Sequence, residues 1–200
     1  MKSQRALPEA GDEAGLRARL IEGALAILNT DGIEAMTLRA VARSAGVSHG
    51  APARHFANLD ALKAEVAAAG YERLSAAIGS AVLELPEDAA AREPLARAVK
   101  TYVQFALENP GLFALIIRMD SPELNSEVLN AQRESASRRF LRLVEESQAR
   151  GWNPDRDARL AAASLWAFAH GLATLWMHGA YPHLNPGATL DEAIDGIIGR

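Results

Sequence analysis

The sequence predicts an all-α protein, and three observations lead to this fold class. Apolar residues recur at the i, i+3, i+4 spacing of one helix face along most of the 200 residues. No segment shows the strict apolar–polar alternation of a half-buried strand. Short stretches rich in Gly, Pro, Asn and Asp separate the periodic segments, as is typical of helix ends. We therefore expect about nine helices, arranged as an N-terminal three-helix domain with a helix-turn-helix and a C-terminal helical bundle.

The composition excludes several classes of protein and site. Hydrophobic residues make up 49% of the chain and charged residues 23%, which is ordinary for a globular protein. The absence of cysteine excludes disulfides and thiolate metal sites. No apolar run reaches the ~18 residues of a membrane span, and residues 1–15 lack the apolar core of a signal peptide, so we expect a cytoplasmic protein without a membrane segment. The net charge of −4 requires any basic surface for nucleic acid to be local.

The first helix is expected over residues 13–30, after a flexible tail at residues 1–12. Its apolar residues keep the helical spacing, and they are Leu16, Leu20, Ile21, Ala24, Leu25 and Leu28. Residues 29–32 are Asn, Thr, Asp and Gly, whose turn chemistry ends the helix. We assign residues 13–60 to the first domain.

Residues 37–56 predict two short helices joined by a tight turn. The Thr37 hydroxyl can accept a hydrogen bond from an N–H of the first turn and so cap the first of them. Gly46 can take the positive φ that ends this helix and reverses the chain. Ser48 can cap a second helix that runs to Phe56. Two short helices joined by a glycine turn form a helix-turn-helix, whose second helix fits a DNA major groove.

The remaining residues, 61–200, predict a larger helical domain. Asn58 can cap a helix that links the two domains and runs to about Leu83. Further helices are expected over residues 94–109, 110–119, 122–151, 154–177 and 190–198. Pro182 and Pro186 mark a loop before the last of these helices.

Residues 21–62 resemble the DNA-binding domain of the TetR/AcrR family of transcriptional regulators. The matching residues are Ala24, Asp31, Gly32, Thr37, Leu38, Arg39, Val41, Ala42, Ala45, Gly46, Val47, Ser48, Gly50, His55 and Phe56. Further along, Trp166, His170 and Gly171 resemble the W-x-x-x-H-G signature of one class of ligand-binding domains in that family. The resemblance implies a regulator whose N-terminal head binds DNA and whose C-terminal bundle binds a small molecule.

Several side chains of the head are candidates for contact with DNA. In the resembled family the front of the first motif helix approaches the DNA backbone, and here it holds Thr37 and Arg39. The expected recognition helix begins at Ser48, where free N–H groups favour phosphate. His49 can bond to a base edge, and Ala51 is small enough to touch a thymine methyl. The expected DNA-binding residues are Thr37, Arg39, Ser48, His49, Gly50, Ala51, Arg54, His55 and Lys63.

Two positions depart from the family pattern. Where the family usually has a tyrosine that holds a phosphate, this chain has Ala53, preceded by Pro52. Where the family usually has a lysine at the start of the fourth helix, this chain has Leu59, although Lys63 lies one turn further and could partly compensate. Phosphate contacts supply much of the affinity for DNA. The sequence therefore leaves open whether the head reads an operator weakly or unusually, or no longer binds DNA.

The second half of the chain holds a group of aromatic residues with two interpretations. They can form an ordinary helical core, or they can line an apolar pocket with a few polar groups that orient a small molecule. Trp166 and His170 are four residues apart and share one helix face. The candidate effector-binding residues are Tyr102, Phe105, Phe113, Met119, Trp166 and His170.

The sequence contains no signal for metal binding or catalysis. His170 and His178 are eight residues apart, and no acidic residue stands beside them at a metal-ligand spacing. No nucleophile elbow, phosphate-binding glycine loop or zinc-protease motif is present. We expect no cofactor, no metal and no enzymatic activity.

A homodimer is expected from the two long helices at residues 122–151 and 154–177. The resemblance implies that they pack against their symmetry mates as a four-helix bundle, which would face two recognition helices ~34–36 Å apart toward a palindromic operator. The favoured function is a transcriptional repressor that a small apolar effector releases from DNA. The alternatives are a ligand-sensing dimer of the same fold without specific DNA binding, and an unrelated helical interaction protein or enzyme.

Overall fold

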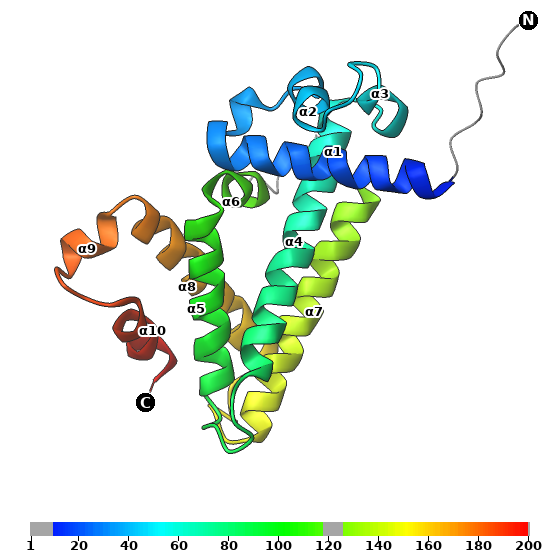
Figure 1. The fold of residues 1–200 in the computed structure, drawn as a ribbon. Helices are drawn as coiled ribbons and strands as arrows, with labels where there is room; N and C mark the ends of the chain where they lie inside the picture. Colours follow the sequence, from blue (N-terminus) through cyan, green and yellow to red (C-terminus); the bar gives the residue numbers. More distant parts are fainter. Residues whose placement is uncertain (1–9, 118–125, 200) are drawn as a thin grey trace, which may run out of the picture. The chain divides into compact units, whose positions relative to one another are not determined.

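The computed structural model describes residues 10–117 and 126–199, and over these ranges it confirms the all-α fold class (Figure 1). Ten α-helices and one 3₁₀-helix account for the described secondary structure. The chain divides into two compact units. The first comprises Met1–Ala69 and Gly111–Leu129, and the second comprises Gly70–Pro110 and Asn130–Arg200.

The first unit is built around the helix-turn-helix. Its helical elements are α1 (Ala10–Asp31), η1 (Ile33–Ala35), α2 (Leu38–Ser44), α3 (Pro52–His55), the first part of α4 (Leu59–Leu83), and α6 (Pro110–Ile117). The expected caps are present, since Thr37 Oγ1 accepts from Ala40 N at 3.1 Å and Asn58 Oδ1 accepts from Ala61 N at 2.8 Å. Gly46 takes the expected positive φ of 68° after α2. The fully buried side chains of the unit include Leu20, Leu28, Met36, Val41, Leu62, Val66, Leu112 and Leu115.

The second unit is a helical bundle. It contains the rest of α4, α5 (Glu93–Glu108), most of α7 (Glu127–Ala149), α8 (Ala158–Met177), α9 (Ala180–Leu184) and α10 (Leu190–Ile198). Helix α5 packs against both α8 and α10, and two ion pairs support its contact with α10. They are Arg92–Asp195 at 3.1 Å and Lys100–Asp191 at 2.7 Å. Helix α10 begins and ends as expected, with a capping box between Thr189 and Glu192.

The recognition helix differs most from expectation. A helix from Ser48 to Phe56 was expected, but α3 comprises four residues, Pro52–His55, and Ser48 caps no helix. A helix that began at Ser48 would need the N–H of residue 52 to donate to the Ser48 carbonyl, and proline has no N–H. Instead Ala51 N donates to Ser48 O at 2.9 Å and closes a turn. Residues 48–51 therefore form a turn that precedes the helix.

Other boundaries differ in the second half of the chain. Helix α8 was expected to begin at Pro154, but it begins at Ala158, where the Asp157 carboxylate accepts from Leu160 N at 2.8 Å. Gln148 Nε2 donates to the carbonyls of Asn153 and Arg156, which stabilises a turn before the helix. Within the described residues α7 begins at Glu127 after Ser126, and the expected start at residue 122 lies outside them.

The expected loop before α10 contains a short helix, α9. Gly179 adopts a φ of 70° and redirects the chain after α8. The rings of Trp176 and Tyr181 then stack at a centroid distance of 5.2 Å, which holds α9 against the end of α8. Pro182 lies in the first turn, where its missing N–H removes no helical hydrogen bond.

Gly111 brings the backbones of α6 and α1 into direct contact within the first unit. A Cβ at this position would lie 1.9 Å from Leu28 O and 2.5 Å from Leu28 C. Both of these atoms belong to the backbone, so a side-chain rotation cannot make room. Only glycine allows this approach.

We predict that Gly111→Ala lowers the free energy of unfolding by about 1–3 kcal/mol, because α6 must move away from α1 and the buried Leu112 and Leu115 lose packing. Thermal or urea unfolding followed by circular dichroism measures this. Gly15→Ala is the matched control, since a Cβ there meets nothing within 4 Å and the helix propensity of alanine should raise stability by about 0.5–1 kcal/mol. An equal response of the two variants would contradict the close contact.

Candidate functional site

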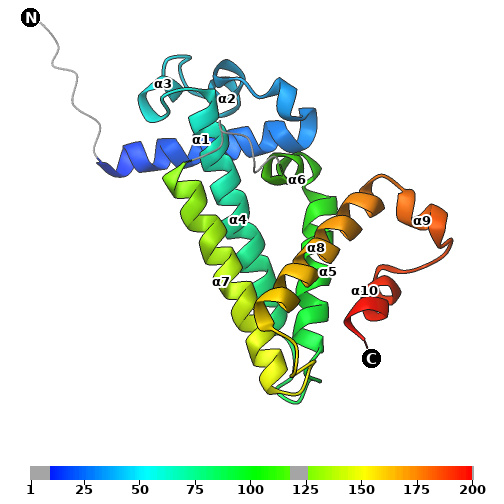
Figure 2. The same ribbon diagram turned by 180° about the vertical axis from the view of Figure 1, so that it is seen from behind.

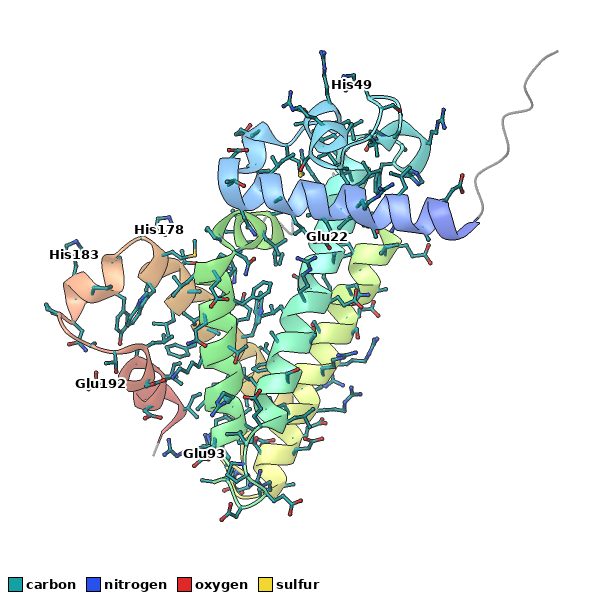
Figure 3. The ribbon with its side chains drawn as sticks, viewed as in Figure 1. Glu22, His49, Glu93, His178, His183 and Glu192 are labelled. Atoms are coloured by element: carbon teal, nitrogen blue, oxygen red, sulfur yellow. The ribbon has the colours of Figure 1, made fainter. Side chains whose placement is uncertain are left out.

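The helix-turn-helix presents a polar surface formed by α2 and the segment that leads into α3. Thr37, Arg39, Ser48, His49, Gly50 and Arg54 are exposed, and His55 is half-buried. Figure 3 shows His49 on the side of this unit that faces away from α1. The structure thus brings most of the expected DNA-binding residues to one accessible region of the first unit.

Two of the expected DNA-binding residues are placed differently. Ala51 is 7% exposed and lies in the core of the first unit, next to the buried Pro52, so its methyl group is not available at the surface. Lys63 is half-buried in the first turns of α4, where its Nζ lies 3.1 Å from Asp60 Oδ1. This ion pair offsets the charge that Lys63 could offer to a phosphate.

Three arginines give the helix-turn-helix its positive charge. Arg39 and Arg43 are four residues apart on α2 and so share one helix face, and Arg54 lies on α3. All three are exposed, and none forms an ion pair with a described residue. Arg43 was missed by the sequence analysis, although its spacing from Arg39 is the signal that could have identified it.

Arg17 of α1 has a structural role at the base of the motif. Its guanidinium lies 5.5 Å from the centroid of the buried Phe56 ring and forms an ion pair with Glu65 of α4. Phe56 ends α3, because its N–H donates to Pro52 O at 2.9 Å. Arg17 therefore helps to hold the segment that carries Arg54 and His55 in place.

A polar cluster lies inside the second unit between α5 and α8. The Tyr102 hydroxyl is hydrogen-bonded to His170 Nδ1 at 2.9 Å, and the Trp166 and His170 rings lie 5.6 Å apart. Burial raises the pKa of Tyr102 and lowers the pKa of His170, so both side chains are kept neutral near pH 7. Three of the six candidate effector-binding residues are therefore in one place.

The other three candidates are more scattered. Phe105 is half-buried on α5, one turn after Tyr102. Phe113 is buried in the first unit and not in the second. Met119 lies outside the described residues.

Tyr71 and Arg133 extend the cluster and were missed by the sequence analysis. Tyr71 of α4 is 8% exposed and accepts a hydrogen bond from the Arg133 guanidinium of α7. Burial raises the pKa of Tyr71, and the nearby Arg133 partly opposes this shift. Tyr71 in turn lies close enough to Tyr102 to contribute to the raised pKa of that hydroxyl. The signal in the sequence was a charged residue at an apolar position, since Arg133 follows Leu129 by four residues on the face that buries Val144.

The described residues show no group of three His, Asp or Glu side chains that could hold a metal ion. His178 and His183 are exposed near the end of α8 and on α9, and Figure 3 shows both pointing outward.

Comparison with known proteins agrees with this architecture. Residues 20–66 match the family described as bacterial regulatory proteins, tetR family, and residues 95–198 match the tetracyclin repressor-like C-terminal domain. No curated protein matches the chain.

Solved structures share the fold over nearly the whole chain. A protein of unknown function from Rhodococcus sp. RHA1 is 32% identical, with coverage of 99% of this chain and 95% of that chain and a TM-score of 0.79. A putative transcriptional regulator from Pseudomonas aeruginosa PAO1 is 26% identical and has a TM-score of 0.64. The match covers 97% of this chain and 89% of that chain. A TetR family transcription regulator from Marinobacter aquaeolei VT8 is 16% identical and has a TM-score of 0.69, and the match covers 94% of this chain and 95% of that chain. At this identity the likeness is one of fold alone. With a tetR-type head at residues 20–66 and a tetracyclin repressor-like domain over residues 95–198, the chain belongs to the TetR family of transcription regulators.

Proposed function

We propose that this protein is a cytoplasmic, ligand-responsive repressor that binds a palindromic operator as a homodimer and leaves it when a small, largely apolar effector binds the second unit. The observation that carries the DNA-binding part is the exposed surface with three arginines that form no ion pair with a described residue, Arg39, Arg43 and Arg54. Membership of a family of transcription regulators supports it.

The three arginines would fix the position of the helix-turn-helix on the phosphate backbone of the DNA, and residues 48–50 would face the groove. Ser48 and His49 are exposed side chains of this turn with both donor and acceptor capacity. Arg54 and His55 follow on α3. If each of the three arginines neutralises one phosphate, a dimer makes six such contacts, which gives a slope of log K against log salt of roughly −5.

Helix α8 supports dimerisation, because five of its apolar residues are exposed. At about 100° per residue, its buried residues Ala161, Leu165, Ala169 and Leu172 lie on one side of the helix. The opposite side carries the exposed Leu160, Ala163 and Ala167, and the exposed Trp166 and Leu175 lie at its two borders. In the view of Figure 2, α8 crosses in front of α5.

The composition of α8 has a second interpretation, which is a membrane-spanning helix. Among the described residues α8 is the one helix long and apolar enough to cross a membrane, but a single such helix is weak support for a membrane protein. We propose instead that α8 packs its buried side against α5 and that a second copy of the chain covers its exposed apolar residues. The exposed side of α7 carries charged residues such as Arg138, Arg142 and Glu145, so we assign the dimer contact to α8.

A second candidate function is a ligand-sensing dimer of this fold without specific DNA binding. The observation that favours it is the loss of two phosphate anchors, at the exposed Ala53 and the half-buried Leu59, next to a recognition helix of four residues. A gel shift with the gene's own upstream DNA separates the two functions. If the protein is a repressor, a palindromic fragment of this DNA must compete for binding better than random DNA does.

We predict that Arg39→Gln weakens operator binding and flattens the salt slope by about 2, because each subunit of the dimer loses one phosphate contact. Fluorescence anisotropy with labelled operator at several salt concentrations measures both quantities. The control is Arg142→Gln, which removes an exposed arginine of α7 and should change neither. A slope that stays constant in Arg39→Gln would exclude a phosphate contact for this side chain.

Restoring the two missing anchors should strengthen DNA binding. The double variant Ala53→Tyr, Leu59→Lys is expected to bind the operator more tightly and with a steeper salt slope than the wild type. Its control is Ala76→Tyr, Leu83→Lys, which adds the same groups at exposed positions of α4 in the second unit. If both double variants behave like the wild type, positions 53 and 59 do not face phosphate in this protein.

Charges on the exposed side of α8 should separate the dimer. Leu160→Glu, Leu175→Glu places two carboxylates on a surface that would be buried between subunits, and we expect the mass in solution to fall from about twice 21.4 kDa to that of one chain. Light scattering after size exclusion measures the mass. Leu83→Glu, Leu184→Glu is the control, because these leucines are 86% and 83% exposed at other sites. A monomeric wild type would contradict the proposed dimer.

A further inference from the structure

Helix α3 is too short to hold its own orientation. It comprises the single turn Pro52–His55, and one turn of helix is not stable without contacts outside itself. Its first residue, Pro52, is buried, and Phe56, directly after its last residue, is 3% exposed. The orientation of Arg54 and His55 between them therefore depends on how these two buried ends are held.

The Phe56 end of α3 is held by a cation from another helix. The Arg17 guanidinium of α1 lies 5.5 Å from the centroid of the Phe56 ring, a distance at which a cation is attracted to the ring face. The Phe56 N–H donates to Pro52 O at 2.9 Å and so ties the same residue to the turn of α3. A displacement of the guanidinium would therefore reach the DNA-facing side chains of α3 through one residue.

Glu65 of α4 fixes the position of this guanidinium. Its carboxylate forms an ion pair with Arg17, and the two side chains are 19% and 41% exposed, respectively. Without such a partner, a long and partly exposed arginine side chain would move among several rotamers. The ion pair also offsets the charge of Arg17, which leaves this arginine with less attraction for a DNA phosphate than the three arginines of the helix-turn-helix surface.

The residues that would face the groove follow the orientation of α3. Residues 48–50 lead directly into it through the buried Ala51, whose N–H donates to Ser48 O at 2.9 Å. Hydrogen bonds to base edges weaken steeply when their distance or angle is disturbed, whereas the attraction between a guanidinium and a phosphate falls off slowly with distance. A loosened α3 would therefore lose discrimination between DNA sequences before it loses attraction to the DNA backbone.

We propose that Arg17 is a positioning residue for the reading of DNA sequence, and that Glu65 acts through it. The contact of Arg17 with Phe56 sets the angle at which α3 and residues 48–50 meet the groove, and Arg17 itself stays off the DNA. The inference rests on the proposed function, in that the helix-turn-helix must bind an operator. It adds a residue of α1 that determines specificity to the residues that touch DNA.

The test compares Arg17→Met with Arg19→Met in the full-length protein. Methionine keeps an unbranched side chain beside the Phe56 ring but removes the cation. Arg19 is an exposed arginine of the same helix that forms no ion pair with a described residue, so its variant removes the same charge without the contact. Fluorescence anisotropy with labelled operator and with random DNA, at several salt concentrations, measures the affinities.

Arg17→Met should bind the operator roughly 10-fold more weakly than Arg19→Met, because both heads of a dimer lose the contact. Its binding to random DNA and its salt slope should equal those of Arg19→Met, so the ratio of specific to non-specific affinity falls. Arg17→Lys keeps a cation that can pair with Glu65 and should recover part of the loss. The proposal is overturned by an unchanged ratio, by a salt slope about 2 flatter in Arg17→Met alone, or by an Arg17→Lys variant no better than Arg17→Met.

A second variant tests whether Glu65 acts through Arg17. Glu65→Gln removes the ion pair and leaves the guanidinium in place, so we expect a smaller loss of specificity in the same direction. The double variant Arg17→Met, Glu65→Gln should be no weaker than Arg17→Met alone, since a residue that acts only through another adds nothing once the other is gone. Losses that add would overturn the link, and Glu65→Gln carries the comparison if Arg17→Met loses its helical circular dichroism.

Hydrogen exchange tests the positioning of α3 without DNA. The Phe56 amide, which donates to Pro52 O, should exchange about 10-fold faster in Arg17→Met than in Arg19→Met, while the amides of α5 in the second unit exchange equally in both. An unchanged rate at Phe56 overturns the inference. Faster exchange in a protein that shifts no operator refutes the repressor and keeps the positioning of α3, whereas operator binding that Arg17→Met leaves intact keeps the repressor and removes this inference.

Discussion

A helix that is apolar on both sides can bury only one of them within its own chain, and α8 is such a helix. Its inner residues pack against α5, while Leu160, Trp166 and Leu175 remain 58%, 45% and 43% exposed. When a second copy of the chain covers exposed apolar residues of this kind, the burial of their surface makes the free energy of dimer formation more favourable. The composition of α8 therefore supports the proposed dimer.

The same helix carries Trp166 and His170, which lie at the border between its buried and exposed sides. His170 is held by Tyr102 of α5 at 2.9 Å, so the polar cluster and the proposed dimer contact share α8 as a structural element. A ligand that moves α8 relative to α5 also changes the surface offered to the second subunit. Binding to one arrangement more tightly than to the other is the condition for such a ligand to act on DNA binding.

The sequence predicted features that depend on neighbouring residues. The caps at Thr37 and Asn58 and the turn at Gly46 involve groups within a few residues of one another, and all three are present. The family resemblance was also confirmed, by the match of residues 20–66. The sequence could show this resemblance because the motif residues are close together in the chain. The i, i+3, i+4 spacing of apolar residues, which predicted the helices, also involves residues that are close together in the chain.

What the sequence did not predict depends on contacts between distant residues or on a missing group. Gly111 is required by the Leu28 carbonyl, and Tyr71 and Arg133 meet across two helices. A local pattern can mark Arg133 as a charged residue at an apolar position, but it does not identify the distant partner of Arg133 or of Gly111. The shortened recognition helix is a different case. Pro52 was judged tolerable in a first turn, but the expected helix placed it at the fifth residue, where its absent N–H breaks the bond to Ser48 O.

Helix α4 belongs to both units. It is one continuous helix, Leu59–Leu83, whose first residues belong to the first unit and whose later residues belong to the second. Tyr71 lies two residues beyond that division and accepts a hydrogen bond from Arg133 of α7. To shift a population from 1:99 to 99:1, an effector must favour one arrangement of the protein by about 5.5 kcal/mol, which exceeds the ~1.5–3 kcal/mol of a single charge-assisted hydrogen bond. Burial of the effector's apolar body must therefore supply part of the difference.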